Sequence, residues 1–80
     1  MEEKSPEYLT RIRGLREDND YSQEYVARLI HVGQRTYSDY ENGKTRIPLD
    51  SMIILAKLYD VDMNYICDLT DYKNVFPSKK

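Results

Sequence analysis

The stretch SQEYVARLIHVGQRTYSDYENG, residues 22–43, predicts two short helices on either side of a tight turn. Ser22 is a favourable N-cap because its hydroxyl can accept a hydrogen bond from a free backbone N–H of the first turn. The buried face of this helix is expected to hold Val26, Leu29 and Ile30. After a turn at residues 31–33, the next helix runs from about 34 to 40. Gly43 then ends it, since glycine readily adopts the left-handed conformation of a helix C-terminus.

Three more helices are predicted outside this stretch. The first starts near residues 5–7, where a serine, a proline and a glutamate suit a helix N-terminus, and ends at the polar cluster 18–20. The fourth starts at Pro48 and runs to Tyr59, and Asp62 can cap the fifth. Residues expected to face inward in these helices are Tyr8, Ile12, Leu15, Met52, Ile53, Leu55, Ala56, Tyr59, Met63, Ile66 and Leu69.

The fold class expected from these patterns is all-α, with five helices in one compact domain. No run of alternating apolar and polar residues is long enough for a strand. The chain has 80 residues, of which 40% are hydrophobic and 32% are charged, and this composition is typical of one small globular domain. We expect the domain to occupy residues 1–70 and residues 71–80 to form a mobile tail.

Several function classes are excluded by composition. The longest apolar run, Met52 to Ala56, is far shorter than a membrane span, and the N-terminus does not resemble a signal peptide, so a cytoplasmic location is expected. With one cysteine, Cys67, and one histidine, His31, the chain cannot assemble a Cys/His metal cluster, and no cofactor is expected. An enzyme is not predicted, because no nucleophile with a base and no phosphate-binding glycine loop is present.

The charge distribution indicates where a polyanion could be contacted. The net charge is −2, which argues against a general polyanion binder. Residues 21–47 nevertheless hold four cationic and three acidic side chains, and this third of the chain alone is net positive. A nucleic-acid partner is therefore expected to be contacted there.

Two short helices around such a turn form a helix-turn-helix, in which the second helix enters the DNA major groove. Residues 22–43, followed by IPLD at 47–50, LAKLYDV at 55–61 and NYI at 64–66, resemble the Xre/Cro family of phage-repressor-like regulators. The resemblance covers about residues 8–70. It implies a compact phage-repressor-like domain that binds double-stranded DNA sequence-specifically and regulates transcription, as a repressor.

The resemblance assigns base reading to the start of the second helix of this pair. Gln34 and Arg35 match the family's base-reading positions, and Ser38 and Asp39 lie one turn along the same face. Arginine can bond both acceptors of guanine, and glutamine can pair with adenine. Asp39 can accept from cytosine, exclude wrong bases or orient Arg35. Without the surrounding motif, the same residues would be interpreted as an ordinary solvent-exposed helix face.

Other residues of the motif are implied to position the protein on DNA. Those assigned to the DNA backbone are Gln23, Thr36, Asn42, Lys44 and Arg46. Arg16 and Glu41 match a charge pair that ties the first helix to the end of the third in similar proteins. His31 stands where the family often has glycine, and histidine tolerates the left-handed conformation better than most residues.

A protein-interaction module, such as an antitoxin or an accessory subunit, is the alternative function. Ile54 and Leu58 are one helical turn apart and off the main apolar stripe, so they are expected to form an exposed patch suited to self-association or a partner. A homodimer, at least on DNA, is expected to use the fourth and fifth helices and the tail from Asp71, because paired half-sites favour dimers.

Overall fold

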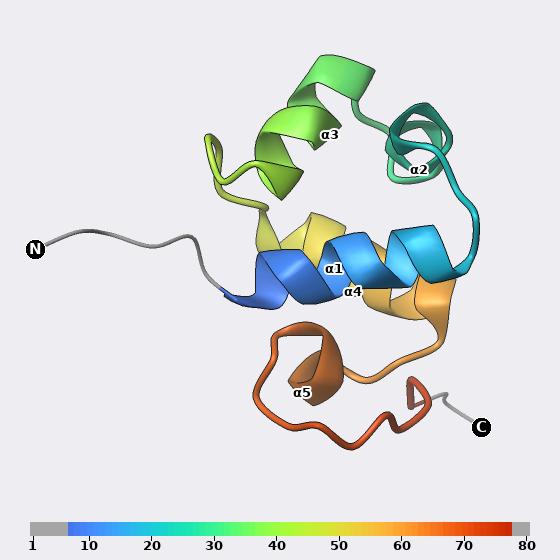
Figure 1. Cartoon of the computed structure of the whole chain (residues 1–80). Coiled ribbons are helices and arrows are strands. Elements are labelled where there is room, and N and C mark those ends of the chain that lie inside the picture. Colours follow the sequence, from blue (N-terminus) through green and yellow to red (C-terminus); the bar gives the residue numbers. More distant parts are fainter. Residues whose placement is uncertain (1–6, 78–80) are drawn as a thin grey trace, which may run out of the picture.

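The computed structural model describes residues 7–77, and every regular element within them is an α-helix (Figure 1). The helices are α1 (Glu7–Asp18), α2 (Gln23–Leu29), α3 (Gln34–Glu41), α4 (Leu49–Tyr59) and α5 (Met63–Ile66). The prediction of an all-α fold with five helices is confirmed. The expected start of the first helix at residues 5 and 6 lies outside the described residues.

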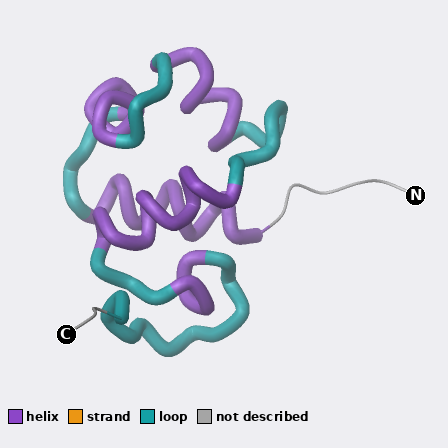
Figure 2. The backbone as a smooth tube through the Cα atoms, turned by 180° about the vertical axis from the view of Figure 1, so that it is seen from behind, coloured by secondary structure: helices purple, strands orange, loops and turns teal. Residues whose placement is uncertain are grey.

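The helices are arranged in three tiers. Helices α2 and α3 lie together at one end of the molecule, α1 and α4 cross its middle, and α5 lies at the other end with the segment that follows it (Figure 1). Figure 2 shows the same arrangement from behind. Helix α1 contacts both α3 and α5, so it connects the two ends.

The helix boundaries follow from local chemistry. At the start of α2, the Ser22 hydroxyl accepts from the Tyr25 backbone N–H at 3.0 Å, and at the start of α5 the Asp62 carboxylate accepts from the Tyr65 N–H at 2.9 Å. Both predicted caps are confirmed. Helix α4 ends at Asp60, whose φ of 54° is left-handed. The N–H of the next residue, Val61, then donates back to the Ala56 carbonyl at 3.0 Å instead of continuing the regular helical pattern, and this bond ends the helix.

One hydrophobic core joins all five helices. Its buried members are Ile12, Leu15, Val26, Ala27, Ile30, Tyr37, Tyr40, Met52, Leu55, Ala56, Tyr59, Val61 and Ile66. Full burial of a valine, leucine or isoleucine side chain stabilises the fold by about 1.5–3 kcal/mol before the entropy of ordering is subtracted. The α2–α3 pair is therefore held on the rest of the domain by apolar contacts as well as by its connections.

Two leucines expected in the core are not there. Leu29 is only half-buried, because Val26, Ala27 and Ile30 centre the inner face of α2 roughly 100° around the helix from it. Leu69 is 75% exposed. Helix α5 has only four residues, and Asp68, with φ 64°, turns the chain before Leu69, so helical periodicity no longer applies there.

The predicted apolar patch on α4 is also wrong. Ile54 and Leu58 are half-buried and pack against the core instead of projecting into solvent. The reason is that α4 is covered on more than one side: α5 packs against it, and Phe76 from the C-terminal segment reaches the same core. The apolar face of α4 is thus wider than a single stripe.

The segment after α5 runs back along the domain through residues 70–77. The Asp62 N–H donates to the Asn74 carbonyl at 2.9 Å, and the Phe76 N–H donates to the Asp60 carboxylate at 3.3 Å. On the other side, the Arg11 guanidinium donates to the carbonyls of Tyr65 at 2.9 Å and Thr70 at 2.7 Å. These bonds attach the segment to α1 and to the loop between α4 and α5.

Candidate nucleic-acid interface

The outer face of α3 begins with three exposed side chains, Gln34, Arg35 and Thr36. Ser38 and Asp39, one turn further on, are half-buried. Tyr37 and Tyr40 lie on the opposite face and are buried in the core. The side of α3 that is expected to read bases is therefore open at its N-terminal end and becomes more enclosed toward Asp39.

The turn between α2 and α3 requires one unusual backbone conformation. His31 has φ 65°, in the left-handed region that is costly for most side chains. The Val32 N–H then donates to the Ala27 carbonyl at 3.0 Å, which closes the end of α2. Gly33 precedes α3 in an extended conformation and gives it no side-chain cap. The turn thus sets the angle between α2 and α3 without covering the first residues of α3.

A buried carboxylate holds the C-terminal end of α3. Glu41 accepts from the Arg16 guanidinium of α1 through Nε at 2.7 Å and Nη2 at 3.2 Å. It also accepts from the Tyr37 hydroxyl at 2.5 Å and from the Gln23 side-chain amide of α2 at 3.0 Å. One side chain therefore connects α1, α2 and α3.

The surroundings of Glu41 favour its charged form. Burial by itself raises the pKa of the carboxyl group, but hydrogen bonds from Arg16, Tyr37 and Gln23 outweigh burial, so the Glu41 pKa lies below its ordinary value. The hydrogen bond to Glu41 raises the pKa of Arg16 in turn. Burial, together with the bond to Glu41, raises the pKa of the Tyr37 hydroxyl. At neutral pH the cluster is thus an ionised pair with a neutral phenol donor.

Gln23, expected to contact the DNA backbone, has part of its amide occupied by this cluster. It is the first residue of α2, and its Nε2 donates to Glu41. An amide nitrogen has two hydrogens, so a second donor remains for an outside acceptor. Gln23 therefore bonds to the cluster and keeps a second donor at the N-terminus of α2.

The loop after α3 carries the remaining predicted backbone contacts. Asn42, Lys44 and Arg46 are all exposed. Gly43 has φ 78°, as predicted for the helix end, and the Lys44 N–H returns to the Asp39 carbonyl at 2.9 Å. Among the residues described, neither Lys44, Arg46 nor Arg35 forms an ion pair within the chain. Three cations thus flank or lie on α3 with their charge uncompensated by a close carboxylate.

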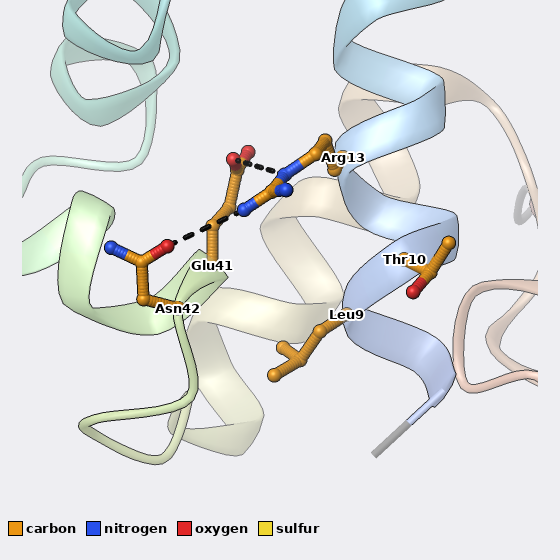
Figure 3. Close-up of a pocket in the computed structure, with 5 residues that line it drawn as sticks. All are labelled: Leu9, Thr10, Arg13, Glu41 and Asn42. Carbon is orange, nitrogen blue, oxygen red and sulfur yellow. Dashed lines mark hydrogen bonds and ion pairs between the residues drawn. The ribbon is translucent and has the colours of Figure 1, made fainter. Parts of the chain in front are cut away.

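Two arginines of α1 were missed by sequence reasoning. Arg11 forms ion pairs with Asp68 and Asp71, both at 3.2 Å, and its guanidinium lies 4.1 Å from the Tyr65 ring centroid. Arg13 reaches Glu41 and Asn42 at the end of α3 (Figure 3). The available signal for Arg13 was its spacing, because residues 13 and 16 are neighbours on a helix surface. The partners of Arg11 are about sixty residues away, and nothing local indicates them.

Within residues 7–77, no group of three or more His, Cys, Asp or Glu side chains is arranged to hold a metal ion. None of the described helices is long and apolar enough to span a bilayer.

Comparison with known proteins gives one family and several relatives. A family model described as helix-turn-helix matches residues 12–66. The chain is 41% identical over 64 residues to an uncharacterized HTH-type transcriptional regulator, YobD of Bacillus subtilis, a match that covers 80% of this chain and 57% of the relative. It is 30% identical over 69 residues to the HTH-type transcriptional regulator AnsR of Bacillus subtilis, covering 86% of this chain and 60% of AnsR.

A further relative comes from a phage. The chain is 43% identical over 54 residues to the cryptic phage CTXphi transcriptional repressor RstR of Vibrio cholerae, with 68% of this chain and 49% of the repressor covered. The chain thus spans about half to three-fifths of the length of these relatives. No solved structure gives a significant match.

Proposed function

The chain belongs to the helix-turn-helix family of Xre/Cro type, and on this premise we propose that it binds duplex DNA sequence-specifically and regulates transcription as a repressor. The observation that carries the proposal is the exposed N-terminal half of α3, which the core and the Glu41 cluster hold outward. A major groove is wide enough to admit such a helix.

In this proposal Gln34 and Arg35 read base edges, with Ser38 and Asp39 at the enclosed end of the same face. Arg35 has no carboxylate partner among residues 7–77, so its guanidinium is available to the two acceptors of a guanine. Asp39 is half-buried, and its charge is repelled by phosphates; it therefore restricts which bases fit more than it adds affinity.

The residues that position the domain lie on both sides of α3. Gln23 offers its second amide hydrogen and the N-terminus of α2 to one phosphate strand. The other phosphate strand is contacted by exposed residues of α3 and of the loop after it, namely Thr36, Asn42, Lys44 and Arg46. The net charge of −2 limits binding away from the specific site, since the chain as a whole does not attract phosphates.

We propose residues 1–70 as the DNA-binding domain, acting as a non-enzymatic regulator in the cytoplasm and as a dimer on paired half-sites about 34 Å apart. The support for a dimer is a set of exposed apolar side chains on the segment that follows α5, namely Leu69, Tyr72 and Val75. Sedimentation of the protein with duplexes carrying one or two half-sites tests this directly. Two protomers that bind the double site without cooperativity would contradict the proposed dimer.

Selection of bound sequences from a random duplex pool tests the main proposal. A defined motif should be enriched. Arg35→Ala should then relax the preference at one base pair and cost about 1–3 kcal/mol, whereas Lys44→Ala should weaken all sequences alike and reduce the salt dependence. Equal losses on specific and random DNA for both variants would contradict the assigned roles, and no enrichment at all would favour a protein-interaction module.

A further inference from the structure

A cleft of about 270 Å³ lies between α1 and the C-terminal end of α3, and Arg13 is one of the residues that line it. Its lining residues are Leu9, Thr10, Arg13, Glu41 and Asn42. In Figure 3 the Arg13 guanidinium extends from α1 toward α3, with Glu41 and Asn42 both in reach. Its Nε lies 3.4 Å from the Glu41 carboxylate, and its Nη2 lies 3.4 Å from the Asn42 side-chain oxygen.

These two contacts are long for hydrogen bonds of a charged group. Charge-assisted N–H···O bonds are commonly about 2.7–2.9 Å long. The Arg16 guanidinium has that geometry on Glu41, at 2.7 Å, and two neutral donors fill the remaining acceptor positions. Glu41 is thus already neutralised by Arg16, and the charge of Arg13 is left over.

The Arg13 side chain is also far more open to solvent than its neighbour. It is 46% exposed, compared with 13% for Arg16. Nη1 has no hydrogen-bond partner among the described residues, and Nη2 has the single long contact to Asn42. The Arg13 guanidinium is thus held at Nε beside the cleft that it lines, and its two outer nitrogens keep donors with which a planar guanidinium can bind an oxyanion.

We propose that Arg13 contacts a DNA phosphate beside Asn42, so that α1 contributes to the nucleic-acid interface. This inference rests on the proposed DNA-binding function, since Asn42 and the loop cations Lys44 and Arg46 are what bring a phosphate strand to this flank of α3. Arg13 keeps its Nε on Glu41 and gives Nη1 and Nη2 to the phosphate. Because the contact is with the backbone, it adds affinity without base preference.

The experiment compares three variants on the selected duplex and on a scrambled duplex over a range of salt concentrations. Arg13→Gln removes the charge, Arg13→Lys keeps the charge without the planar fork, and Lys57→Gln is the matched control. Lys57 is exposed on α4 and lies 5.7 Å from the Phe76 ring centroid, in the part of the fold that carries the C-terminal segment. Circular dichroism of each variant shows whether it is folded.

The salt dependence distinguishes a phosphate contact from a brace. Arg13→Gln should lower the slope of log K against log salt by about 0.9, so that its affinity deficit shrinks about threefold to fourfold between about 50 and 200 mM salt. The deficit should be the same on both duplexes, and Arg13→Lys should keep the wild-type slope. Lys57→Gln should leave the slope unchanged.

Two results would overturn the inference in different ways. A folded Arg13→Gln variant with the wild-type slope would show that Arg13 only braces α3 and would leave the DNA-binding function intact. A wild-type protein that binds both duplexes equally weakly, with no selected motif, would overturn the proposed function and the role of Arg13 with it.

Discussion

Replacing Glu41 by glutamine should destabilise the fold more than its small change of shape suggests. The Glu41 side chain is fully buried and accepts from three helices, with Arg16 only 13% exposed beside it. The amide cannot neutralise Arg16, and its NH₂ group faces the donors that the carboxylate accepted from. Breaking a buried ion pair in this way costs about 3–5 kcal/mol. For a domain of this size, about 3 kcal/mol corresponds to a fall in Tm of about 12–24 °C.

The measurement is urea and thermal unfolding followed by circular dichroism, with Glu24→Gln as the matched control. Glu24 is exposed on α2 and lies 3.9 Å from Arg28 in a surface i,i+4 pair. Such a pair contributes only about 0.3–0.5 kcal/mol. Similar losses of unfolding free energy in Glu41→Gln and Glu24→Gln would refute the conclusion that the Glu41 cluster stabilises the arrangement of α1, α2 and α3.

The pH dependence gives an independent check on the same cluster. Glu41 has a pKa below its ordinary value of 4.5 in the folded chain, so its contribution is fully present above that value. As the pH falls through the lower folded pKa, the contribution is lost, because the folded carboxyl must then bind a proton. The stability gap between wild type and Glu41→Gln should therefore be constant near neutral pH and narrow only in acid. A gap that is independent of pH down to strong acid would contradict an ionised Glu41.

Three substitutions at two positions test backbone conformation and helix propensity. His31→Gly should raise the free energy of unfolding by about 0.5 kcal/mol, because glycine adopts φ 65° without strain. His31→Val should lower it by more than about 1 kcal/mol. Denaturant midpoints in the reverse order would contradict backbone strain at His31. Gly14→Ala should stabilise by about 0.5–1 kcal/mol, since a Cβ there meets nothing within 4 Å and α1 gains helix propensity; an unchanged or lower Tm would count against it.

The elements that sequence alone predicted are those specified by local chemistry. Ser22, Asp62 and Gly43 act within three or four residues of themselves, and each was found at the helix end where its side chain or backbone freedom indicated it. The helix-turn-helix at residues 22–43 could also be located, because the helical periodicity and the turn residues are both short-range signals. The exposed start of α3 follows from the same pattern, since Tyr37 and Tyr40 fix which face turns inward.

The missed burial of Ile54 and Leu58 and the missed role of Arg11 involve partners that are distant in sequence. Ile54 and Leu58 look like an outer stripe until Phe76 and α5 are packed beside α4. Arg11 binds carbonyls and carboxylates of residues 65–71, and no spacing within α1 points to them. Whether a charged side chain on α1 meets solvent, DNA or another helix depends on tertiary packing, which helical periodicity does not contain.

The Glu41 cluster explains how so short a helix can be presented in one orientation. Apolar contacts through Tyr37 and Tyr40 attach α3 to the core, but they are not directional and tolerate rotation about the helix axis. A planar carboxylate with donors from α1, α2 and α3 tolerates far less rotation of α3, because each hydrogen bond weakens steeply as its angle departs from linear. Gln23 also belongs to this cluster and lies at the N-terminus of α2. The side chain that we propose contacts a phosphate strand is therefore hydrogen-bonded to the carboxylate that restricts the rotation of α3. If the proposed phosphate contact is made, this shared hydrogen bond fixes the angle at which the exposed face of α3 meets the groove.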